Sequence, residues 1–242
     1  RELDSLEIID GLPNYSFLTS GKIALEGFLE KPKQTRGAIT LKRLELGWLD
    51  NKLVSKKGLK LLFGDQSITL QPTQFNAPGL NLAAKGFYRL DNYLNFEIES
   101  KGDLSVLSAI DDSIEFARGP FKMQVIGEGP LEQLQYNGTG NISNAALLLS
   151  SLGEPLHEIE MLLSLQGRHL NIASAAARTG LGKMQLSGDA HFPIAEANKM
   201  EFQVSLDRAH LRPMPEILIT TSGQLRYVGN GAKQNISGNL NL

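Results

Sequence analysis

The chain has 242 residues, a net charge of −2 and no cysteine. The near balance of 24 Lys and Arg with 26 Asp and Glu gives no electrostatic signature of nucleic-acid binding, so we expect no nucleic-acid partner. The lack of cysteine excludes a disulfide framework and a zinc ribbon. Because no apolar run reaches the roughly 18 residues of a membrane-spanning helix, we expect any membrane anchor to lie outside this chain.

Apolar and polar residues alternate with period two along most of the chain, as in Leu94-Asn95-Phe96-Glu97-Ile98. Successive side chains of a strand point to opposite faces, so this pattern predicts an antiparallel sheet with one apolar and one hydrated face. In chain order, the residues that we expect to line the apolar face are Ile23, Leu25, Ile39, Leu41, Ile68, Leu70, Leu80, Leu82, Leu94, Phe96, Ile98, Phe121, Met123, Val125, Met161, Leu163, Leu165, Met184, Leu186, Phe202, Val204, Leu206, Leu225 and Tyr227.

One sequence motif, Gly-x-apolar-x-apolar-x-Gly, recurs at residues 21–27, 182–188 and 223–229. It predicts short strands whose flanking glycines allow a turn or a bulge at each end. Its unequal spacing favours a sheet of unequal strands over a leucine-rich or propeller array.

A single stretch, residues 103–114, has helical spacing, with Leu104, Leu107, Ile110 and Ile114 on one side and Asp103 as a candidate N-cap. We predict one short helix there. The Leu-rich runs 145–149 and 159–165 fit either a helix or a strand.

Residues that could carry out chemistry are scattered. The histidines His157, His169, His191 and His210 occur singly, which favours exposed strand or turn positions over a metal site, and no nucleophile elbow or P-loop is present. We therefore expect no enzyme activity, no catalytic residue, no metal and no cofactor. The lysine-rich stretch 52–60 could contact anionic headgroups, although a charged turn that blocks edge pairing is the favoured interpretation.

The apolar face must be covered by something. Two leaves of one sheet could close into a sandwich about 10 Å thick, or they could stay apart and leave a groove for an apolar guest. Periodicity alone favours the closed core.

The second half of the chain resembles TamB-type proteins of the AsmA-like superfamily. The resemblance rests on a Pro-Leu-x-x-Ile step at Pro155-Leu156-His157-Glu158-Ile159, a strand with Leu170 and Ile172, and the glycine-bracketed run 180–188. Residues 202–242 continue this sequence pattern, and residues 1–118 match it more loosely. We expect two continuous segments, 1–118 and 119–242, within one extended sheet.

The resemblance implies an all-β fold, the β-taco, in which an elongated, highly curved antiparallel or mixed sheet folds on itself around an apolar groove. It implies a periplasmic location, an inner-membrane anchor outside this chain, and transport of phospholipids by their acyl chains. A TamA-type outer-membrane barrel would be contacted through parts of the protein not present here. The alternative is a periplasmic scaffold or chaperone for outer-membrane β-barrel proteins, acting through strand edges. A carbohydrate-active β-solenoid enzyme is disfavoured, because no acid/base pair stands on a common face.

Overall fold

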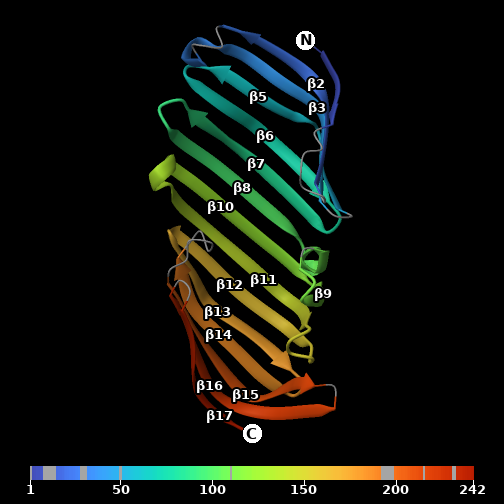
Figure 1. Ribbon diagram of the computed structural model, residues 1–242, viewed down its shortest axis with the longest axis vertical. Helices are drawn as coiled ribbons and strands as arrows, with labels where there is room; N and C mark the ends of the chain where they lie inside the picture. The colour runs from blue at the N-terminus through green and yellow to red at the C-terminus, as the bar shows by residue number, and fades with distance from the viewer. Residues whose placement is uncertain are drawn as a thin grey trace. The chain divides into compact units, whose positions relative to one another are not determined.

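A computed structural model describes residues 2–7, 15–27, 32–48, 51–109, 111–191, 199–214, 216–230 and 233–242 (Figure 1). Strands account for 81% of residues, and the described part has no helix of seven or more residues. The sheet is highly curved, and each strand pair whose register is described is antiparallel. The antiparallel all-β sheet predicted from the alternation is confirmed, and so is the high curvature that the resemblance implies.

The chain forms two compact units, Arg1–Lys101 with Gln124–Gln135, and Gly102–Met123 with Tyr136–Leu242. Strands β8, β10 and β11 contribute residues to both. The first unit contains β1 (Glu2–Glu7), β2 (Tyr15–Glu26), η1 (Pro32–Gln34), β3 (Arg36–Trp48), β4 (Asn51–Ser55), β5 (Leu59–Gly64), β6 (Ser67–Ala77), β7 (Leu80–Arg89), most of β8 (Tyr93–Asp103), the end of β10 (Pro120–Pro130) and η3 (Leu131–Gln133).

The second unit is a series of hairpins in which each strand pairs with the next from β11 to β17. Its elements are η2 (Leu104–Ala109), β9 (Ile114–Arg118), β11 (Gln135–Leu149), β12 (Leu156–Gly167), β13 (His169–Thr179), β14 (Gly182–His191), β15 (Met200–Met214), β16 (Ile217–Asn230) and β17 (Lys233–Asn241). In the first unit the order is less regular, because β3 pairs with both β4 and β5.

Bulges interrupt several strands of the second unit. Asn144 in β11 and Arg208 in β15 adopt positive φ angles of 46° and 49°, and each is the extra residue at a shift in register. The N–H of Asn144 donates to Glu160 Oε1 at 2.7 Å, and the N–H of Arg208 donates to Ser222 Oγ at 2.8 Å. A side chain of the neighbouring strand thus satisfies the backbone group that the bulge removes from the ladder, where the strand bends.

The predicted helix over 103–114 is a 3-10 helix, η2, confined to Leu104–Ala109. Asp103 caps it: Oδ1 accepts the N–H of Ser105 at 2.9 Å, and Oδ2 accepts the N–H of Gly119 at 2.9 Å. The helix does not continue to Ile114 because that residue begins β9, which pairs with the end of β11. The predicted cap residue is confirmed, and it ties η2 to the segment that follows β9.

Candidate functional site

The candidate site is the apolar face of the sheet, which side chains from successive strands form in rows. Each row crosses the strands at positions that lie directly opposite one another. In the second unit one row runs through Gly140, Leu163, Ile172, Gly188, Phe202, Tyr227 and Ile236, and the next through Ile142, Met161, Ala175, Leu186, Val204, Leu225 and Gly238.

The first unit repeats this arrangement. One row runs through Ile23, Ile39, Leu61, Leu70 and Gly86, and a parallel one through Leu25, Gly37, Phe63, Ile68 and Tyr88. Gly86 continues its row to β8, since a Cβ atom built on it would lie 2.8 Å from the Cα of Phe96. Within each unit, therefore, apolar residues that are far apart in sequence form continuous bands across the strands.

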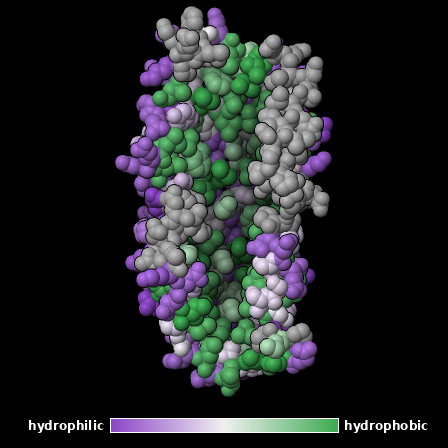
Figure 2. Space-filling view, in the orientation of Figure 1, coloured by the Kyte–Doolittle hydropathy of each residue, from purple (hydrophilic) through white to green (hydrophobic). Residues whose placement is uncertain are grey.

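Burial of the predicted lining residues decides between a closed core and an open face. Leu165 and Leu206 are buried, whereas Leu25 and Met123 are exposed by 42% and 43%. The remaining predicted residues are half-buried. Within each unit, Figure 2 shows hydrophobic residues gathered around a hollow, with hydrophilic residues along its left margin. The apolar face is thus neither completely covered by other parts of the protein nor fully exposed to water.

The accessible surface supports the same conclusion. It measures 15,643 Å², whereas a compact protein of 26.4 kDa exposes about 10,600 Å². Two separate compact proteins of half that mass would together expose about 12,800 Å². The measured area exceeds both values, so the chain exposes more surface than one compact protein, or two compact halves, of its mass.

One part of the apolar face is covered. Leu104, Ala117, Ala145, Leu156 and Ile159 form a buried cluster in the second unit. Two predicted lining residues, Phe121 and Met184, pack against this cluster and are therefore partly shielded by protein. The η2–β9 segment thus closes a small core at this place, while the rows toward β17 have no such cover among the described residues.

The opposite face is polar. In the second unit its rows include Gln185, Ser205, Gln224 and Asn239, and Ser187, Gln203, Arg226 and Ser237. These residues, with Leu186, Val204 and Leu225, line a cavity of about 580 Å³. Polar residues make up most of its lining, and Leu186, Val204 and Leu225 of the second apolar row contribute the rest of the large side chains.

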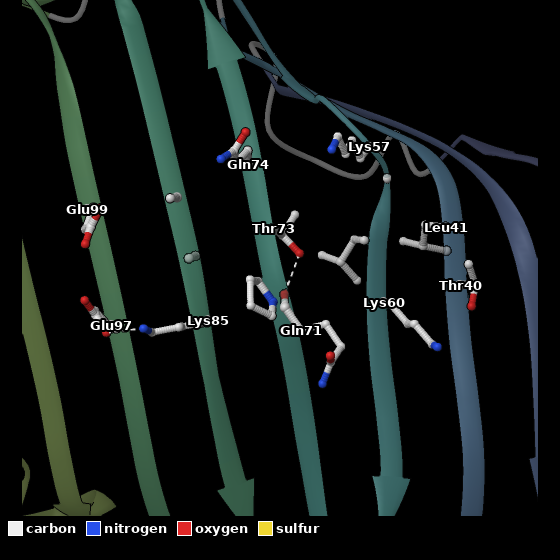
Figure 3. A pocket seen from close by; sticks show the side chains of 15 residues that line it. Thr40, Leu41, Lys57, Lys60, Gln71, Thr73, Gln74, Lys85, Glu97 and Glu99 are labelled. Carbon is white, nitrogen blue, oxygen red and sulfur yellow. Dashed lines mark hydrogen bonds and ion pairs between the residues drawn. The ribbon is translucent and has the colours of Figure 1, made fainter.

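A cavity of about 520 Å³ in the first unit has the same character (Figure 3). Of the predicted lining residues it includes Leu41, and its charged side chains are Lys57, Lys60, Lys85, Glu97 and Glu99. Figure 3 shows Lys85 of β7 and Glu97 of β8 directed toward one another, with 2.6 Å between Nζ and Oε2. This contact lowers the pKa of Glu97 and raises that of Lys85, so the pair is a charged link between neighbouring strands.

Sequence reasoning did not predict the pairing of two histidines. His169 at the start of β13 and His191 at the end of β14 lie directly opposite each other, with 4.4 Å between ring centroids. Among the described residues no group of three or more His, Cys, Asp or Glu side chains is arranged to hold a metal ion. The turn at Gly180 indicates that the two histidines lie near each other, but their direct pairing also depends on the register shift between Ile172 and Ala175.

Comparison with known proteins identifies no relative. No family model matches the chain, and no curated protein or solved structure shows a significant match. In the described part of the chain, no helix has the length and apolar character needed to cross a membrane.

Proposed function

We propose that this chain is a segment of an apolar β-groove that shields acyl chains and conducts phospholipids between the inner and outer membranes of a bacterium, within the periplasm. The observation that carries the proposal is the set of half-buried apolar rows, which present hydrocarbon to water in each unit. The sequence resemblance to TamB-type proteins is the basis for naming the two membranes and the periplasm in this proposal. It also implies that a TamA-type barrel is contacted by parts of the protein beyond this chain.

The dimensions of the rows suit an acyl chain. At about 4.8 Å per strand, the row from Gly140 to Ile236 extends for about 29 Å. One leaflet of a bilayer has a hydrocarbon thickness of about 15 Å, half of the bilayer core. A tail lying along the row therefore has apolar partners over its whole length. Successive residues of the row are mostly apolar, so a tail finds similar contacts at each step along it.

The energetics favour capture of a lipid tail without any catalytic group. Burial is worth about 0.8 kcal/mol per methylene, so complete shielding of a 16-carbon tail corresponds to at most about 13 kcal/mol. Half-buried side chains already lose part of their hydration, and a bound tail covers the remainder. The headgroup stays with the hydrophilic margin in water, which avoids the cost of burying a charge.

A matched pair of substitutions tests the proposal. Leu186→Asp puts a charge on the apolar face, whereas Gln185→Asp puts the same charge on the polar face of the same strand. The protein is incubated with vesicles that contain a fluorescent phospholipid, repurified, and assayed for bound lipid and for transfer to acceptor vesicles. We expect wild type and Gln185→Asp to capture and transfer lipid, and Leu186→Asp to lose both.

The pair Leu82→Asp and Asn81→Asp repeats the test in the first unit, and circular dichroism verifies that each variant is folded. Equal lipid capture by the apolar-face and polar-face variants would contradict the proposal. So would a wild-type protein that captures none.

The second candidate is a scaffold for β-barrel proteins, and β17 favours it. All residues of β17 are exposed, and Ile236, at 70% exposure, keeps the alternation of the strand. Such a strand offers a template for β-augmentation by an unfolded client. Crosslinks from β17 to client strands, together with the absence of lipid capture, would support this function in place of the first.

A further inference from the structure

We propose that His169 and His191 form a binding site for a divalent transition-metal ion on the polar face of the second unit. The site lies on the face opposite the apolar rows, so the proposal does not depend on lipid transport. It follows from the geometry of two neighbouring strands, β13 and β14.

The pairing places both imidazoles on the same side of the sheet. His169 and His191 are direct partners in the antiparallel register, and side chains of directly opposite residues point to one face. Their ring centroids are 4.4 Å apart, and the ring planes are tilted by 48°. The backbone therefore holds two metal-ligating groups next to each other without any loop having to move.

The separation suits chelation. A metal ion binds imidazole nitrogen at about 2.0–2.1 Å, so two nitrogens on one tetrahedral ion lie about 3.3–3.4 Å apart. Rings whose centroids are 4.4 Å apart meet this requirement through small side-chain rotations, and the χ2 torsion of histidine has a broad minimum. His169 is exposed and His191 half-buried, so an ion can reach the pair, and water completes its coordination.

The neighbouring charges are mixed. Asp189 lies two positions before His191 on the same face, where its carboxylate attracts a cation. Lys199 precedes β15, and its carbonyl oxygen accepts the backbone N–H of His191 at 3.2 Å, so this residue brings a positive charge to the same end of the hairpin. Neutral imidazole is a good ligand for Cu²⁺, Ni²⁺ and Zn²⁺, and the Irving–Williams order predicts the highest affinity for Cu²⁺.

Titration of the purified chain with Cu²⁺ and Ni²⁺, followed by calorimetry and by Cu²⁺ electron paramagnetic resonance, tests the site. We expect one ion per chain, with two nitrogen ligands in the Cu²⁺ spectrum. His169→Gln and His191→Gln should each lower the affinity by about tenfold or more, because one imidazole donor is lost. His157→Gln, which removes a partly exposed histidine elsewhere on the sheet, should leave the affinity unchanged.

Three results would overturn the proposal. They are equal affinities in wild type and His169→Gln, a comparable loss in His157→Gln, and binding that requires two chains according to light scattering. Circular dichroism of each variant verifies that a loss of binding is not a loss of fold.

Discussion

Phe202 and Tyr227 stand directly opposite each other on β15 and β16, and their rings stack with 6.2 Å between centroids. Both residues are half-buried, and they continue the row that begins at Gly140. This pair is the most bulky part of the apolar face in the second unit. A tail that passes along the row must therefore contact it.

Phe202→Asp should abolish lipid capture with only a partial loss of stability. Because the side chain is half-buried, we expect the free energy of unfolding to fall by about 1–2 kcal/mol, less than for a fully buried aromatic residue. Urea denaturation and the vesicle assay measure the two effects. Gln203→Asp on the polar face is the control and should change neither. Complete unfolding of Phe202→Asp would indicate a closed core in place of an open face.

Ala209→Leu should destabilise the second unit. Ala209 follows the Arg208 bulge and is 0% exposed, so a larger side chain has no room. We expect a loss of about 1–3 kcal/mol in the free energy of unfolding, as is typical of overpacked cores. Ala176→Leu, on an exposed position of β13, should be close to neutral. A similar effect of both substitutions would mean that the bend at Arg208 is not tightly packed.

Gly223→Ala should be costly, because φ at this residue is +151° and a Cβ atom would lie 2.0 Å from the carbonyl oxygen of Asn239. We expect a loss of more than about 1 kcal/mol in thermal or urea unfolding. Gly64→Ala is the matched control, since no atom lies within 4 Å of its added Cβ. If both substitutions cost the same, close strand approach at Gly223 is not what requires glycine.

Acid should weaken the cap of η2. The N–H groups of Ser105 and Gly119 hold the pKa of Asp103 below its ordinary range, so the carboxylate stabilises the fold above about pH 4. This contribution is lost as the pH falls through the lowered pKa. Asp103→Asn should therefore cost about 0.5–2 kcal/mol at pH 7 and progressively less toward pH 3.

Urea denaturation at a series of pH values measures this difference. Asp112→Asn removes a carboxylate from the same segment, and its side chain accepts no hydrogen bond among the described residues, so it is the matched control. A gap between wild type and Asp103→Asn that stays constant with pH would contradict the assigned role of the Asp103 carboxylate.

Alternation was enough to predict the fold class, because period two identifies a strand with one apolar and one polar face. It did not identify every member of the apolar rows: Leu61, which lies directly opposite Ile39, is not among the predicted residues. Which strands meet is not local information: β3 pairs with β5 as well as with β4, so the partner of Ile39 cannot be found from the nearest turn. The rows that make up the candidate site depend on those pairings.

Bulges were the main feature that sequence reasoning missed. Asn144 and Arg208 adopt a conformation usually associated with glycine, and a side chain of the neighbouring strand, which no local pattern contains, accepts the N–H of each. A similar shift between Ile172 and Ala175 sets the register that brings His169 opposite His191. A one-residue change there would separate the histidines, so hairpin symmetry predicts the pair only when the bulge is known.

The most direct test of the central claim places a photo-crosslinking amino acid at neighbouring positions of one strand, Val204 and Ser205, in cells that produce the full protein. These two side chains point to the apolar and the polar face, respectively. The account predicts phospholipid adducts at Val204 and none at Ser205. Equal labelling at the two positions, or no lipid at Val204, would contradict it.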